Sequence, residues 1–429
     1  MNGALKRLQR RDYAAALEKL EKPSGDTNKL LYRLERGLIL HYQGEWTSSN
    51  GQFDKAERLI DKLYTKSASR ELGAFVTNDA IRPYTGEEFE RVFIHFYRSL
   101  NYRYLGDPQA SLVEARKANL KLSDYARNPE YELSYKNDAF IQYVTGLLYE
   151  AEGEWNDAYV SYRAAERGYE AYSESFGIPP PRQLGRDLRR AATVLGFDDD
   201  MALLADRYGL EREAGTRSGA EAIVIVESGM IARKRETEIS IPITEADNPK
   251  VVHATSRRAL QRYCHSHGRY HSHRIKYWLK LALPYYETRR SRVHAVRISA
   301  GERSATAELV EDLDAIAIKT LEDKEDAVLL RTIARALAKY TATKAAEKES
   351  SVLGTLINLF GVATEAADTR SWLSLPAHIH MARLSLPPGT VDLLVELLDS
   401  RGNLVEQQLF PGLTLTAGRP LVLSHRSFE

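Results

Sequence analysis

The spacing of apolar residues changes near residue 210 and divides the chain into two parts. Up to about residue 210, apolar residues recur every three to four positions, which is the period of a helix with one buried face. From residue 219 onward, short β-branched runs bounded by turn residues replace this pattern, most clearly over residues 221–227. We therefore predict a helical domain over residues 1–212 and a β-rich domain over residues 219–429.

The β-rich half contains further strand-like segments on both sides of a helical stretch. Alternating runs flank a Pro-Pro-Gly turn at 387–389, which indicates a small antiparallel sandwich. Helical spacing returns between about 313 and 366, and we expect this insertion to cover one sheet. The predicted class is α + β multidomain: an N-terminal α-solenoid followed by an antiparallel β-sandwich-like domain with a helical insertion. Further strands are expected at 237–243, 293–299, 305–310, 379–384, 391–398, 404–409 and 419–424.

Small and aromatic residues recur in one order within the helical half. In the clearest unit, Gly146 would let a first helix approach a second, Gly153 would turn the chain, and Tyr162 would pack back against the first helix. This order resembles a tetratricopeptide repeat (TPR), although the turn glycines lie 62 and 47 residues apart instead of about 34. The solenoid is therefore predicted to be TPR-like with insertions. The three units are Gly146, Tyr149, Gly153, Trp155, Ala158, Tyr162 and Ala165; Gly37, Leu40, Gly44, Trp46, Ser49, Phe53 and Ala56; and, more weakly, Ser99, Tyr102, Gly106, Ser111, Ala115 and Ala118.

Six segments along the whole chain carry a second resemblance. They lie at 78–92, 100–102, 114–119, 311–317, 334–340 and 367–376. Together they are similar to an uncharacterised bacterial family that combines TPR-like repeats with a β-rich C-terminal region. The resemblance covers roughly residues 4–425. It implies a lipoprotein signal, an association with secretion or cell-wall lipoproteins of the curli-assembly type, and no established catalytic residues.

Two observations predict different cellular compartments for the protein. The resemblance implies the periplasmic face of an outer membrane, provided that a signal has been removed from this chain. The first residues lack the apolar core of a secretory signal, which taken alone predicts a cytoplasmic protein. No run of about 18 apolar residues occurs, so we expect no transmembrane helix.

The charge balance narrows the class of partner. Sixty Lys and Arg face 59 Asp and Glu, a net charge of +1, which argues against a nucleic-acid partner for the chain as a whole.

The single cysteine, Cys264, excludes an intrachain disulfide and a multi-cysteine metal cluster. Phosphate-binding loops, nucleophile elbows and His-Glu-x-x-His motifs do not occur in the sequence. These observations favour a protein that is not an enzyme.

A histidine cluster is the candidate metal site. Four histidines and the only cysteine fall within ten residues, and imidazole and thiolate both suit zinc or another transition metal. The alternative is a solvated, basic, insertion-like loop, because the spacing matches no established zinc signature. The candidate ligands are Cys264, His265, His267, His271 and His273.

Basic and aromatic residues alternate around this cluster, between about 254 and 292. Such a composition binds single-stranded nucleic acid, anionic lipid or anionic glycan in other settings. The alternative is a solvated rim around a sheet. The final arginines of this region are Arg289, Arg290 and Arg292, and its aromatic residues include Trp278, Tyr285 and Tyr286.

A dense polar group between two repeats is the candidate partner-binding site. One interpretation is a ligand site on the concave face of the solenoid. The other is an ordered loop held by arginine–carboxylate pairs, with a carboxylate that caps a helix. The residues are Asn78, Asp79, Arg82, Tyr84, Glu87, Arg91 and Tyr102.

These patterns favour a non-enzymatic scaffold for protein–protein interaction within a bacterial envelope or secretion-associated assembly. The expected partner is a protein or peptide segment, such as an outer-membrane secretion protein or a cell-wall lipoprotein. Two alternatives stay open. One is a metal-binding protein or metal-dependent envelope enzyme that uses the 264–273 cluster. The other is a homo-oligomer in which one subunit takes its neighbour's C-terminal strand.

Overall fold

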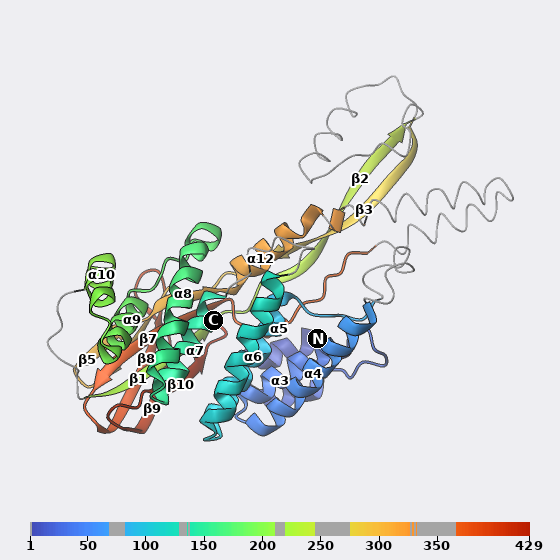
Figure 1. Ribbon diagram of the computed structural model, residues 1–429. Coiled ribbons are helices and arrows are strands. Elements are labelled where there is room, and N and C mark those ends of the chain that lie inside the picture. Colours follow the sequence, from blue (N-terminus) through green and yellow to red (C-terminus); the bar gives the residue numbers. More distant parts are fainter. Residues whose placement is uncertain are drawn as a thin grey trace.

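The computed structural model describes residues 2–67, 82–127, 135, 138–210, 219–244, 275–326, 328–329, 332 and 366–429 (Figure 1). Three layers stack on one another: an array of helices, a four-stranded sheet A, and a second four-stranded sheet C. A two-stranded ribbon extends beyond these layers. Among the described residues, no helix is both long enough and apolar enough to cross a membrane.

The first half is helical, as predicted, and its helices form consecutive hairpins. Three of the turns need a glycine, because Gly44, Gly106 and Gly153 have φ angles of +85°, +76° and +78°. The helices are α1 (Asn2–Gln9), α2 (Tyr13–Lys19), α3 (Lys29–Tyr42), α4 (Trp46–Ser67), α5 (Glu88–Tyr104), α6 (Pro108–Ala126), α7 (Ala139–Ala151), α8 (Trp155–Phe176), α9 (Arg182–Leu195) and α10 (Asp198–Tyr208).

Close packing within the helical pairs confirms the TPR-like roles. A Cβ on Gly146 of α7 would lie 2.4 Å from the ring of Tyr162 on α8, and a Cβ on Gly37 of α3 would lie 2.7 Å from the ring of Phe53 on α4. A larger residue at either glycine would push the helices apart. In the third pair, the corresponding small residues Ser99 on α5 and Ala115 on α6 are both buried.

The described residues of the second half form ten strands, and nine of them lie in regions of strand-like sequence. Sheet A has the order β10-β1-β7-β6 and sheet C the order β5-β4-β8-β9, while β2 and β3 form the separate ribbon. The strands are β1 (Ala220–Ser228), β2 (Arg233–Thr244), β3 (Ile275–Glu287), β4 (Ala295–Ala300), β5 (Arg303–Thr306), β6 (Glu308–Asp312), β7 (His378–Leu386), β8 (Gly389–Leu398), β9 (Leu404–Leu415) and β10 (Leu421–Arg426).

We predicted a purely antiparallel sandwich, but sheet A contains one parallel pair of strands. The last strand, β10, runs parallel to β1, with Ile223 paired to Val422. All other neighbours in the two sheets are antiparallel. A parallel neighbour is possible because β10 enters sheet A from β9 of sheet C, through residues 416–420, and does not form a hairpin with β1. The C-terminal strand therefore lies in the chain's own sheet.

Each face of sheet A packs against a different layer. Ala222, Val224 and Val226 point into the core between the two sheets, and the alternate residues Ile223 and Ile225 point into the core beneath the helices. The TPR-like array therefore covers sheet A directly. The described part of the predicted insertion is α12 (Leu313–Asp323), and its Ile316 joins the same core. Most of the insertion lies outside the described residues.

Two features differ from the predicted strands. The segment predicted as one strand at 305–310 is two, because the chain leaves sheet C after Thr306 and enters sheet A at Glu308. The basic region also contains β3, which pairs along its length with β2. In β3, apolar residues occupy alternate positions from Ile275 to Leu283, but Lys276 and Lys280 between them give the segment the composition of a solvated loop.

Candidate functional site

Charged side chains lie on the face of sheet A that meets the helices. The two-residue period of β1 places Glu221 and Glu227 on the same face as Ile223 and Ile225. On β7, Arg383 lies on this face beside Met381. Buried charges are costly unless each one finds an opposite charge or hydrogen bonds. The helices supply these partners.

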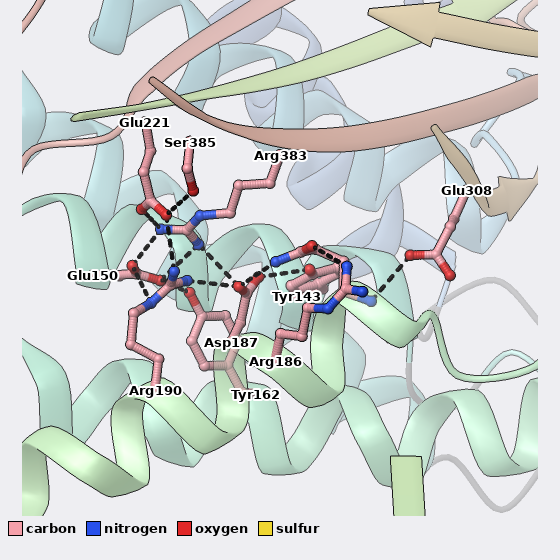
Figure 2. A network of polar contacts seen from close by, with 11 residues as sticks. Tyr143, Glu150, Tyr162, Arg186, Asp187, Arg190, Glu221, Glu308, Arg383 and Ser385 are labelled. Atoms are coloured by element: carbon pink, nitrogen blue, oxygen red, sulfur yellow. Dashed lines mark hydrogen bonds and ion pairs between the residues drawn. The ribbon is translucent and has the colours of Figure 1, made fainter. Parts of the chain in front are cut away.

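Arg383 is the centre of one network (Figure 2). Its guanidinium donates to Glu150 on α7 and Asp187 on α9, in both cases with an Nη1–O distance of 3.1 Å, and it also pairs with Glu221 on β1. The side chains of Arg383, Glu150 and Asp187 are 3%, 2% and 0% exposed. A single arginine therefore joins two helices and two strands in the interior of the protein.

A second guanidinium and two phenols complete this network. Arg190 on α9 binds Asp187 at 2.6 Å and Glu221 at 3.0 Å. Tyr143 donates its hydroxyl to Asp187 at 2.7 Å, and Tyr162 donates to Glu150. Burial alone would raise the pKa of Glu150, but Arg383 and Arg190 outweigh it and lower the pKa to about 2. Glu150 is thus held as a carboxylate.

Glu227 is the centre of a second connection between helices and sheet. The hydroxyls of Tyr42 on α3 and Tyr97 on α5 both donate to its Oε2 atom at 2.7 Å. Close by, Tyr104 on α5 donates to Ser424 on β10 at 2.7 Å. The first helices of successive pairs therefore contact the sheet through tyrosine hydroxyls as well as apolar side chains.

The predicted partner-binding residues are mostly engaged inside the protein. Tyr84 is buried and donates to Glu90, and Glu87 binds Lys234 of β2 and Lys324 after α12. Arg91 donates to the carbonyls of Thr85 and Gly86 at 3.0 and 2.9 Å. The structure brings Arg82, Tyr84, Glu87 and Arg91 together at the start of α5, whereas Tyr102 lies near the other end of that helix, and Asn78 and Asp79 lie outside the described residues.

The start of α5 has the helix-capping carboxylate that was expected if this polar group is an ordered loop. Glu87 and Glu90 form a capping box, in which each side chain binds the backbone N–H of the other residue. Burial and the nearby carboxylate of Glu87 raise the pKa of Glu90 to about 7. Burial also raises the pKa of Glu87, but Lys234 and Lys324 outweigh it and hold that pKa below its ordinary value.

Two buried carboxyl groups hold the segment that leads into β7. Glu90 on α5 accepts the N–H of Trp372 at 2.7 Å, and Glu35 on α3 accepts the N–H of Leu373 at 2.9 Å. Upstream, Arg370 pairs with Asp368 at 2.7 Å and donates to the carbonyls of Thr27 and Arg82. Asp368, Arg370 and Trp372 therefore form a polar junction between the helices and the segment that leads into sheet A.

The candidate metal ligands, Cys264, His265, His267, His271 and His273, lie outside the described residues. Within the described part of the chain, no group of three or more His, Cys, Asp or Glu side chains is placed to hold a metal ion. A zinc site in the 264–273 cluster stays a prediction.

The residues that join the helices to the sheet were not singled out from the sequence. Glu150 and Asp187 lie in helical stretches among other charged residues, and Arg383 lies in an apolar strand. Their partners come from segments up to 233 residues apart, so no local pattern links them. One local signal exists: in β1, Glu221 and Glu227 have the same parity as two buried isoleucines, which implies buried partners for both acids.

The chain matches no protein-family model and no curated protein. Among solved structures, it is similar to one crystal structure of MamA at 13% identity over 48% of this chain and 93% of that chain, with a TM-score of 0.32. A second MamA structure gives 12% identity over 50% and 95%, with a TM-score of 0.30. BtubC (BKLC) from P. vanneervenii gives 13% identity over 51% and 82%, with a TM-score of 0.32. These TM-scores are below 0.5 and do not establish a shared fold. The TPR-like assignment therefore rests on the helical pairs described above.

Proposed function

We propose that this protein is a non-enzymatic scaffold for protein–protein interaction. The observation that carries the proposal is the attachment of a TPR-like helical array to a sheet by buried ion pairs, centred on Arg383. Such an attachment makes a rigid platform, and rigid platforms lose little conformational entropy when a partner binds.

The partner is proposed to bind the outer face of α6 and α8. The first helices of the pairs contact the chain's own sheet through Tyr97 and Glu150, so that face is already occupied. The outer helices carry exposed aliphatic side chains: Val113 and Leu120 on α6 are 46% and 62% exposed, and Val160 on α8 is 57% exposed. Val113 and Leu120 are seven residues apart and therefore lie on one face of α6, and apolar groups that gather on one face mark interaction surfaces in other proteins.

The scaffold is further proposed to belong to a bacterial envelope or secretion-associated assembly at the periplasmic face of the outer membrane. The support is the sequence resemblance along residues 4–425. Fractionation of cells that produce the protein from its native gene tests this location. Recovery of the protein only in the cytoplasmic fraction would contradict it.

A quantitative pull-down from native envelope extract tests the scaffold function. The variant V113D/L120D/V160D is expected to lose, by at least tenfold, the proteins that the full-length protein enriches. The control L203D/L404D/L409D replaces side chains that are 50%, 52% and 49% exposed elsewhere on the surface. It is expected to retain the same proteins.

Three outcomes would contradict the proposal. One is equal loss of the enriched proteins in both triple variants. Another is the absence of any enriched protein with the unmodified chain. The third is turnover of a substrate by purified protein that captures no partner.

A further inference from the structure

The β2–β3 ribbon belongs to a strongly basic part of the chain. Residues 233–292 contain fourteen Lys and Arg but only five Asp and Glu, a net charge of +9. The chain as a whole has a net charge of +1, so all other residues together carry −8. Charge asymmetry of this size within one chain is typical of proteins that bind a polyanion.

The described arginines of this region gather at the foot of the ribbon. Arg233 begins β2 and pairs in register with Glu287 at the end of β3. Arg235 binds Glu287 at 2.9 Å, and these two side chains are 45% and 52% exposed. Arg289 follows two residues after β3, and Arg290 is exposed. Arg233 and Arg235 therefore lie beside Glu287, and Arg289 and Arg290 follow Glu287 within three residues along the chain.

Arg289 lacks a carboxylate of its own. Its Nη1 atom lies 3.5 Å from the sulfur of Met230, and no carboxylate of the described residues is within salt-bridge distance. Burial and the guanidinium groups of Arg233 and Arg235 lower its pKa, and the opposing effects of Asp314 and Glu287 do not cancel this shift. The arginines at the foot thus repel one another, and a bound anion would relieve that repulsion.

We propose that Arg233, Arg235, Arg289 and Arg290 bind the phosphate groups of an anionic phospholipid surface. Guanidinium groups match phosphate because their planar fork donates two parallel hydrogen bonds. Clusters of four to eight basic residues bind anionic headgroups in this way. The site goes beyond the proposed scaffold function and does not depend on it.

The sequence of the ribbon favours a lipid surface over a nucleic acid. The strand residues 239–243 and 275–279 are mostly apolar in sequence and include Tyr277 and Trp278, whereas Leu281, Ala282 and Leu283 are buried. Tyr285, next to the arginines, is 36% exposed. Tyrosine and tryptophan are enriched where a protein meets the headgroup layer of a membrane. A ribbon that entered a nucleic-acid groove would need polar side chains to contact base edges.

Co-sedimentation with lipid vesicles tests the proposal on the full-length protein. We expect binding to vesicles of phosphatidylcholine with 30% phosphatidylglycerol, and little binding to phosphatidylcholine alone. Raising NaCl from 50 to 500 mM is expected to weaken binding at least tenfold, because salt screens exposed charges. The variant R233A/R289A/R290A is expected to bind at least tenfold more weakly.

Two matched variants separate charge at this site from net charge and from misfolding. R58A/R401A/R419A removes three exposed arginines elsewhere and is expected to bind like the unmodified protein. R233K/R289K/R290K keeps the charge but loses the planar fork, and it is expected to bind more tightly than the alanine variant and more weakly than the unmodified protein. Equal binding to both kinds of vesicle, equal loss in the two alanine variants, or binding to a DNA duplex at least tenfold tighter than to anionic vesicles would overturn the proposal.

Discussion

Arg383 on β7 and Glu150 on α7 form a buried ion pair across the boundary between the helical array and sheet A. Removing one partner of such a pair leaves an uncompensated charge in the interior, which costs about 3–5 kcal/mol. We therefore expect Arg383→Met to lower the free energy of unfolding by about that amount, measured by urea denaturation. Arg297→Met, which removes an exposed partner of Glu396, is the control and is expected to leave the urea midpoint unchanged. Equal effects of the two substitutions would contradict a central role for Arg383.

The contact between Gly146 and Tyr162 sets the separation of α7 and α8. Gly146→Ala places a methyl group where the ring of Tyr162 lies, and overpacking of this kind costs about 1–3 kcal/mol. Gly51 also lies within a helix, but a Cβ there meets no atom within 4 Å. Gly51→Ala is therefore expected to stabilise the protein by up to about 1 kcal/mol. Thermal unfolding of both variants checks the opposite signs, and a destabilised Gly51→Ala with an unaffected Gly146→Ala would refute the packing account.

The tyrosine hydroxyls at Glu227 are expected to contribute to stability. Tyr97→Phe removes one of the two phenols that donate to this buried acid, and loss of a hydrogen bond to a buried group costs about 1–3 kcal/mol. Tyr286→Phe is the control, because the buried Tyr286 hydroxyl has no hydrogen-bond partner in the described structure. That substitution is expected to be neutral or stabilising. A comparison of urea midpoints in which Tyr286→Phe costs as much as Tyr97→Phe would argue against the assigned role.

Glu35 is expected to make stability depend on pH near neutrality. Burial raises its pKa from 4.5 to about 7, so between these values the folded state binds more protons than the unfolded state. Stability from this group is therefore greatest below about pH 4.5 and falls as the pH rises to about 7. Glu35→Gln removes the titration and keeps an oxygen acceptor for the N–H of Leu373.

Unfolding free energies of both proteins between pH 5 and 8 test this sign. The stability of the unmodified protein relative to Glu35→Gln is expected to fall with rising pH, by at most about 3 kcal/mol. A difference that stays constant, or that grows with pH, would show that Glu35 titrates in its ordinary range or below it.

Local patterns predicted most of the elements but not their assembly. The periodicity of residues 1–210, the turn at Gly153 and the small-to-aromatic contact of Gly146 with Tyr162 depend on neighbours within one hairpin, so the sequence contains them. The covering of sheet A by the helices depends on pairs such as Tyr97 with Glu227, which are 130 residues apart. A single sequence does not indicate which distant residues will pair in this way.

Local sequence predicted some features of the candidate sites, whereas features that depend on distant residues could not be predicted. The capping role at Glu87 follows from a local spacing, and the structure contains the capping box. The lysines that bind Glu87, Lys234 and Lys324, come from a ribbon and a helix end that the sequence could not place beside α5. The strand β3 was not predicted, because Lys276 and Lys280 between its alternating apolar residues give the segment the composition of a solvated loop.

Amide hydrogen exchange of the full-length protein tests most directly whether the helical array and sheet A form one unit. Peptides from α5, α7, β1 and β7 should open with the same free energy as urea is raised, because buried ion pairs and a common core join them. Arg383→Met should lower all four opening free energies together. Helical peptides that stay protected after β1 and β7 have exchanged would contradict the account, because the helices would then be stable without the sheet.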